Sequence, residues 1–109
     1  MPFDATLAER LRSLLRGSYS VSEKKMFGGL AFMVNGHMCC GIVGKDLVVR
    51  TGPDASIEAL RLPHSRPMDF TGRPMRGFVF VAAAGFHSDR DLNGWVQRGL
   101  DFVLAQPPK

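Results

Sequence analysis

The sequence has few cysteines, a single tryptophan and a single tyrosine, and it lacks any long apolar run. Its 109 residues include two cysteines, one tryptophan and one tyrosine. Cys39 and Cys40 are neighbours, and adjacent residues of an extended strand point to opposite faces, so we expect no disulfide between them. A chain without disulfides is typical of a reduced compartment, and we expect a cytoplasmic protein. No apolar run reaches the ~18 residues of a membrane helix, and the first residues do not resemble a signal peptide, so we expect no membrane partner.

The sequence also lacks any block of like charge. Lysine and arginine total 14, aspartate and glutamate total 10, and the formal net charge is +4. An excess this small permits a nucleic acid or an acidic partner without indicating one. Direct nucleic-acid binding is therefore the weakest of the functions that we consider.

Residue patterns of catalysis and of cofactor or metal binding are missing as well. His37, His64 and His87 are far apart in the sequence, and no C-x-x-C or H-x-x-x-H spacing supplies metal ligands. A phosphate-binding loop places its lysine after the glycines and before a helix, whereas here the lysines precede Gly28-Gly29 and a strand follows. We expect no catalytic residues, no cofactor and no metal, and hence a protein that is not an enzyme.

Three segments have helical spacing. Residues 4–16 carry a stripe of four leucines at positions 7, 11, 14 and 15, with Asp4 or Thr6 as the N-cap. We expect residues 53–62 to form a short helix that begins at Pro53, with Ile57, Leu60 and Ala59 on its buried side. Ser88 begins the last helix, which continues to about residue 105.

The remaining segments predict strands. Asn35-Gly36 between two apolar runs indicates a hairpin that pairs Val34 with His37 and Phe32 with Cys39. Before that turn we expect one long strand, residues 24–34, which bends or bulges at Gly28-Gly29. A separate hairpin at Gly28-Gly29 is the alternative. Further strands are expected at 47–50, 68–70 and 77–82.

The order of these elements defines the fold class. It is α-β-β-β-α-β-β-α, which predicts a two-layer α+β domain with an antiparallel sheet. We expect a single domain over residues 1–109, with its core at about 5–105 and a flexible tail at 106–109.

Both faces of the first hairpin are apolar, which is unusual for an antiparallel sheet with one face in water. The expected pairing puts one set of side chains on each face: Leu30, Phe32, Val34, Cys39 and Val43 on the first, and Ala31, Met33, Met38, Cys40 and Ile42 on the second. We expect part of the second face to meet another copy of the chain or a protein partner. The alternative is that the helices cover both faces.

The segment from residue 66 to 76 is the densest in polar residues. Arg66, Arg73 and Arg76 could contact an anionic ligand or a partner, or one of them could pair with Asp69 and fix the loop. Both interpretations remain open.

One ordered set of motifs resembles a known family. Lys25-Met26-Phe27-Gly28-Gly29 is followed by an apolar strand, a turn that ends in Gly36, a second apolar strand and the residues DLVVR at 46–50. This set is similar to the N-terminal domain of the TfoX/Sxy family, and a closing helix with Trp95 and Gly99 extends the similarity over about residues 5–105. The resemblance implies a structural role for Lys25, for the MFGG motif at 26–29 and for Gly36.

The resemblance implies a fold like that of secretion chaperones and a regulatory function. Known members are bacterial competence regulators that act with a transcription activator and carry a second, C-terminal domain. Because this sequence ends at Lys109, we expect a stand-alone N-terminal domain. We expect a non-enzymatic interaction domain, acting as a homodimer or through a protein partner. A small-molecule (anion)-binding or enzymatic domain that uses the loop from Arg66 to Arg76 is the alternative.

Overall fold

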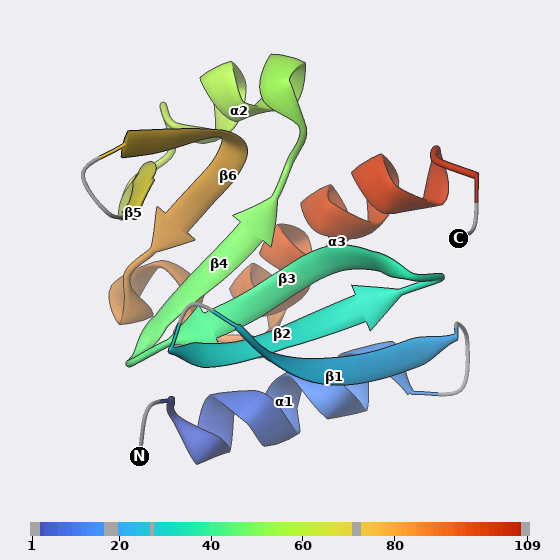
Figure 1. Cartoon of the computed structure of the whole chain (residues 1–109). Helices are drawn as coiled ribbons and strands as arrows, with labels where there is room; N and C mark the ends of the chain where they lie inside the picture. Colours follow the sequence, from blue (N-terminus) through green and yellow to red (C-terminus); the bar gives the residue numbers. More distant parts are fainter. Residues whose placement is uncertain (1–2, 17–19, 27, 71–72, 108–109) are drawn as a thin grey trace.

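The structure is a computed structural model that describes residues 3–16, 20–26, 28–70 and 73–107, and of residues 68–70 and 73–76 it describes the backbone alone. Figure 1 shows one twisted sheet with helices beside it. The elements in chain order are α1 (Ala5–Leu15), β1 (Val21–Met26), β2 (Gly29–Val34), β3 (His37–Val43), β4 (Asp46–Arg50), α2 (Pro53–Ala59), β5 (Ser65–Phe70), β6 (Arg73–Val81), the 3-10 turn η1 (Ala83–Phe86) and α3 (Asp89–Leu104).

The sheet has six strands in the order β1-β2-β3-β4-β6-β5, and every neighbouring pair is antiparallel. This arrangement confirms the predicted α+β class and the predicted pattern of three helices separated by antiparallel strands, with one more strand before α2 than expected. The prolines of the segment after α2 are compatible with its place in the sheet, because β5 lies at an edge, where a missing N–H breaks no ladder.

Side-chain caps begin both long helices. The Asp4 carboxylate accepts hydrogen bonds from the backbone N–H groups of Thr6 and Leu7, at 2.8 and 3.2 Å. The Ser88 hydroxyl accepts one from Asp91 N–H at 3.1 Å. Each cap satisfies donors that the first turn of a helix leaves without a partner. The predicted cap residues Asp4 and Ser88 are thus confirmed.

The short helix α2 differs from expectation. Ile57, predicted to be buried, is 64% exposed, and Ala59 is the buried residue of this helix. The cause is the way in which the helix is attached at its start. Thr51 and Gly52 donate their N–H groups to the carbonyl of Gly77, at 2.8 and 3.1 Å. The start of α2 is therefore attached to β6 through backbone atoms, and the middle of the helix faces outward.

The predicted long first strand is wrong, because it is two strands. Met26 pairs with Gly29, so the chain reverses between them and β1 runs back along β2. Gly28 has a φ of +72°, a left-handed conformation that favours glycine. Gly29 is required for a different reason: a Cβ atom there would lie 1.8 Å from the carbonyl oxygen of Ile42 on β3.

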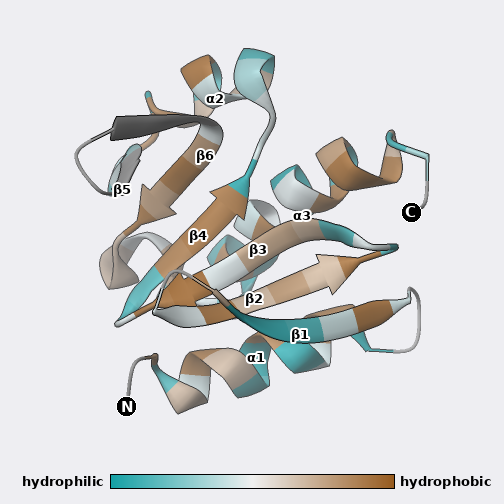
Figure 2. Ribbon diagram, in the orientation of Figure 1, coloured by the Kyte–Doolittle hydropathy of each residue, from teal (hydrophilic) through white to brown (hydrophobic). Residues whose placement is uncertain are grey.

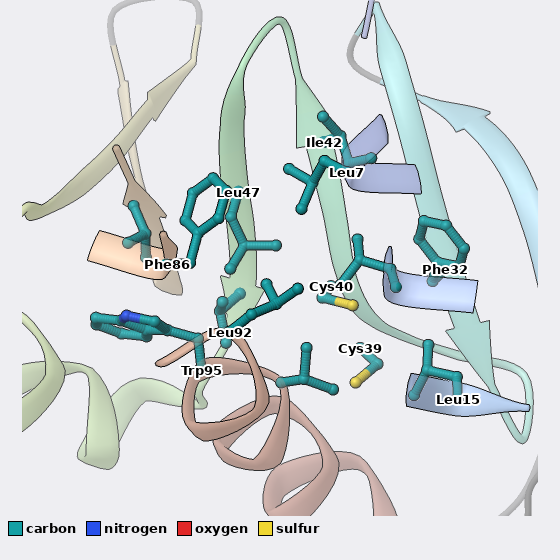
Figure 3. Packing of buried hydrophobic residues seen from close by; sticks show 14 of the residues in the cluster. Leu7, Leu15, Phe32, Cys39, Cys40, Ile42, Leu47, Phe86, Leu92 and Trp95 are labelled. Atoms are coloured by element: carbon teal, nitrogen blue, oxygen red, sulfur yellow. The ribbon is translucent and has the colours of Figure 1, made fainter. Parts of the chain in front are cut away.

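The predicted pairing of Phe32 with Cys39 is also wrong, although the pairing next to the turn is as predicted. The Asn35-Gly36 hairpin pairs Val34 with His37 as expected, but Phe32 pairs with Cys40, so β3 has one extra residue. That residue is Cys39, and it forms a β-bulge. As a result Cys39 and Cys40 enter the same core instead of opposite faces, as Figure 3 shows. Both thiols are free, and hydrogen bonding with Cys39 together with burial raises the pKa of the Cys40 thiol well above its usual value.

The main core lies between the sheet and the helices α1 and α3. Figure 2 shows the apolar residues concentrated on β2, β3, β4 and β6, whereas the middle of the edge strand β1 is hydrophilic. The two long helices and four of the strands supply most of its buried side chains: Leu7, Leu11 and Leu15 from α1; Leu30, Phe32 and Val34 from β2; Cys39, Cys40 and Ile42 from β3; Leu47 and Val49 from β4; Val79 and Val81 from β6; Leu92, Trp95, Val96, Leu100 and Val103 from α3.

The two glycines of the first turn should differ in how much stability they contribute. We expect Gly29→Ala to lower the free energy of unfolding by about 3 kcal/mol, because the new Cβ must displace the backbone of β3. Gly28→Ala should cost only about 1 kcal/mol, the strain of a left-handed alanine with open space around its side chain. Urea unfolding measures both. Equal losses in the two variants, or no loss in Gly29→Ala, would contradict this account of the turn.

Candidate functional site

The sheet has a second apolar cluster on the face away from α1 and α3. Four buried side chains form its centre and four partly exposed ones form its border: Ala31, Met38, Val48 and Phe80, and then Met26, Met33, Val43 and Phe78. Every residue of this cluster comes from a strand, and within the described part of the chain none comes from a helix. We call this surface the helix-free face.

The centre of the helix-free face is buried even without a helix above it. Its four residues are between 0 and 8% exposed. Figure 1 shows the strong twist of the sheet, whose strands run in clearly different directions from β1 to β6. A twisted sheet is concave along one diagonal, so side chains of neighbouring strands cover one another there. The partly exposed border is therefore the part that another molecule would contact first.

The bulge changes which residues occupy this face. The sequence alone placed Cys40 and Ile42 here and Val43 on the other side. One extra residue before Cys40 reverses the alternation, so Cys40 and Ile42 enter the helix side and Val43 joins the helix-free face.

Charged side chains surround the apolar centre. Arg66 donates to the Asp46 carboxylate at 2.7 Å, and its guanidinium lies 4.7 Å from the centroid of the Phe80 ring. Lys24 pairs with Ala31 across the strands and so shares its face. Arg50 lies 5.7 Å from the ring of Phe78 and 5.1 Å from that of Phe102. These four charges, three positive and one negative, leave the border of the face cationic.

Of the three arginines selected from the sequence, one can be placed by its side chain. Arg66 belongs to the border of the helix-free face and forms an ion pair there with Asp46. Pairing of an arginine with Asp69 and contact with a ligand both stay predictions. Arg73 and Arg76 lie on β6, but their side chains, like that of Asp69, are outside the described residues. A ligand bound by all three arginines stays a prediction.

The motif residues of the first hairpin lie around its turn. Lys25 pairs with Leu30 and is therefore on the helix side, and Met26 belongs to the border of the helix-free face. Phe27 lies outside the described residues. Gly36, with a φ of +85°, forms the next turn together with Asn35, whose φ is +53°.

The histidines and cysteines do not form a group of metal ligands in the described part of the chain. His37 is at the start of β3, where its Nε2 atom lies 2.7 Å from the carbonyl oxygen of Pro107. Over the described residues, no three His, Cys, Asp or Glu side chains are grouped as they would be around a metal ion. None of the helices in the described ranges is both long enough and apolar enough to cross a membrane.

Sequence reasoning missed Lys24 and Arg50 as members of this site. Their side chains join it only because of cross-strand pairing, Lys24 with Ala31 and Arg50 with Phe78. The sequence would have placed Lys24 on this face only under the alternative prediction, a separate hairpin at Gly28-Gly29. Arg50 ends a predicted strand, and no spacing in the sequence connects it to Phe78.

An ion-pair cluster attaches the edge strand β1 to helix α1. Arg12 donates to both carboxylate oxygens of Glu23, at 2.8 and 2.7 Å, and also bonds Glu9. Hydrogen bonding to Glu23, and then to Glu9, raises the pKa of Arg12. The same bond with Arg12 lowers the pKa of Glu23. The cluster fixes the position of β1, and with it Lys24 and Met26.

With this geometry in place, a comparison with protein families identifies the chain. The model of the TfoX N-terminal domain matches residues 13–103, which is most of the sequence. The chain belongs to the TfoX N-terminal domain family. The match confirms the resemblance seen in the motifs of the first hairpin, and it includes every strand of the helix-free face. No curated protein and no solved structure matches this TfoX N-terminal domain.

The Arg12–Glu23 pair gives this domain a definite dependence on pH. A carboxyl group with a lowered pKa in the folded state contributes stability above its unfolded pKa, and this contribution is lost as pH falls through the folded pKa. For Glu23 the loss should therefore occur below 4.5, the ordinary value. We expect Arg12→Ala to move the pKa of Glu23 up toward that value in an NMR titration of the side-chain carboxyl. Arg16→Ala, a change in an exposed arginine at the end of α1, is the control. An unchanged pKa of Glu23 in Arg12→Ala would show that the pair does not form in solution.

Proposed function

We propose that this TfoX N-terminal domain is a non-enzymatic interaction module in the cytoplasm that serves transcription regulation by binding another protein through its helix-free face. The observation that supports this function is the apolar cluster on that face, which is contributed by strands alone and has a partly exposed border. Membership of the TfoX N-terminal domain family supports the regulatory context.

The side chains of the border suit binding to a protein. Met26 and Met33 are unbranched and polarisable, and methionines of this kind adapt to an irregular opposing surface. Phe78 and Val43 add area that can be desolvated. A central apolar patch with a charged border is also the usual anatomy of protein interfaces.

The charges of the border favour a different protein over a second copy of the chain. A twofold dimer brings the same patch against itself. Lys24, Arg50 and Arg66 would then face their own equivalents, and among the described side chains of the border Asp46 alone would compensate. A partner whose apolar patch is bordered by aspartate and glutamate would instead be attracted to this surface. We therefore assign the face to an acidic-bordered protein partner.

A charge in the border should abolish this interaction without unfolding the domain. We expect Met33→Glu to remove the partner captured by the wild-type domain from a cell extract, because it places a carboxylate in the desolvated patch. Arg16→Glu introduces the same side chain at an exposed site on α1 and should leave the capture unchanged. The captured protein is then purified, and its affinity for the wild-type domain and for both variants is measured by calorimetry.

Three outcomes would overturn the proposal. A purified candidate that binds wild type and Met33→Glu equally does not use this face. A dimer that persists at low and high salt in light scattering and dissociates in Met33→Glu would assign the face to a second copy. Binding of single-stranded DNA that weakens steeply with salt and requires Lys24 and Arg66 would assign it to nucleic acid.

A further inference from the structure

A groove with no place in the function proposed above lies at the start of α3. Its two lobes, of about 280 and 330 Å³, share Leu62, Asp91 and Trp95 and so form one continuous depression. One wall is the segment that leads from α2 into β5, and the other is the first half of α3. Figure 3 shows Trp95 at the border of the core, on the far side of Leu92 from the two cysteines.

The floor of the groove is apolar and its walls are charged. Trp95 is only 6% exposed and donates its indole N–H to the carbonyl of Gly85 at 3.1 Å, which fixes the ring. Arg90 and Arg98 line one lobe with Asp91. Arg98 also lies 3.7 Å from the carboxylate of Glu58, an exposed side chain outside the lining. The guanidinium of Arg98 lies 5.7 Å from the Trp95 ring.

A glycine in this lining has no structural reason in the chain itself. Gly94 is inside the helix α3, where glycine is less favourable than alanine by about 1 kcal/mol. A Cβ atom at Gly94 would meet nothing within 4 Å, so packing among the described residues does not require the glycine. Because Gly94 has no side chain, the backbone of α3 is exposed at the groove. Glycine is the residue that lets a ligand approach a backbone closely.

The opposite lobe contains a strained residue. His64 has a φ of +69°, a left-handed conformation that is uncommon for a residue other than glycine. It packs against Gly85, where an added Cβ would lie 3.0 Å from the His64 Cβ. The His64 carbonyl accepts the N–H of Ala82 at 2.9 Å and so holds the strained backbone in place. Strained residues of this kind concentrate at ligand sites.

We propose that this groove binds a small organic anion with a flat apolar body, such as an aromatic carboxylate. The carboxylate lies between Arg90 and Arg98 and replaces the exposed Glu58 as the partner of Arg98. The flat body lies against Gly94 and the exposed edge of Trp95, with Leu62 on its other side. Guanidinium groups bind carboxylates through paired N–H donors, and both arginines come from the same stretch of α3 as the open glycine. His64 closes the second lobe, where it can donate a hydrogen bond to a polar substituent.

Trp95 is the one tryptophan of the sequence, so its fluorescence reports on the groove alone. We expect benzoate to change the emission of Trp95 in a saturable way when the tryptophan is excited selectively. Benzamide has the flat body without the charge, and acetate has the charge without the flat body. Each should bind at least about tenfold more weakly, the loss expected when one charge-assisted hydrogen bond or the apolar contact is missing.

Substitutions at Gly94 test the site without endangering the fold. Gly94→Ala should raise the melting temperature, because its Cβ meets nothing within 4 Å and alanine favours a helix. Gly94→Leu also favours the helix and should not lower it. Gly94→Leu should at the same time abolish the response to benzoate, since its side chain fills the lobe. Arg98→Gln should weaken benzoate binding by about tenfold, whereas Arg16→Gln, on α1, should not change it.

The possible results separate clearly. A saturable benzoate response that survives Gly94→Leu would overturn the proposal, as would equal binding of benzoate and benzamide. Absence of any benzoate response in the wild-type domain would overturn it as well. Because Met33 and Gly94 are on different surfaces, partner binding and benzoate binding can fail independently.

Discussion

The extra residue in β3 is the constraint on which the rest of the structure depends. Cys39 has no partner on β2, so every side chain after it changes face. Cys40 and Ile42 then pair with Val49 and Leu47 on the helix side, and these pairs continue the core into β4. Helix α3 packs directly on the bulge: a Cβ atom on Gly99 would lie 2.6 Å from the Cys39 carbonyl oxygen. The bulge thus determines both what α3 covers and what remains on the helix-free face.

The elements of the fold could be predicted from the sequence where they depend on local interactions. The leucine stripe of α1, the Asp4 and Ser88 caps and the Asn35-Gly36 turn each involve residues within a few positions of one another. The bulge and the turn after Met26 could not be predicted in this way. Gly29 must be glycine because of the Ile42 carbonyl, which belongs to the next strand, 13 residues later in the chain. The unpaired position of Cys39 could not be predicted from the sequence either. It depends on how two strands and a helix pack together and not on the alternation of residues within one strand.

The candidate site was predictable to a similar degree. Apolar residues on both faces of the hairpin indicated a second apolar surface, and Arg66 does lie at its border. Single-residue alternation could not assign its members correctly once a bulge had intervened. The groove at α3 was missed for another reason. A glycine inside a helical pattern is ordinarily a small defect, and the role of Gly94 becomes apparent only when the space around it is known. The same holds for His64, whose identity gives no sign of a left-handed backbone.

Helix α1 connects the two surfaces through two arginines, Arg10 and Arg12, which lie on roughly opposite sides of the helix. Arg12 bonds Glu23 on β1, beside the helix-free face. Arg10 donates to the carbonyls of Phe86 and His87, at 3.0 and 3.3 Å, and to Asp89 at the start of α3, beside the groove. Both are side-chain contacts at the surface, and each by itself contributes little to stability. Together they fix β1 and the start of α3 to the same helix, so the relative position of the two surfaces depends on α1. Coupling between two sites requires an element whose equilibrium both sites affect. A ligand in the groove could therefore influence the helix-free face through α1, or through the sheet on which α3 packs at the Cys39 bulge.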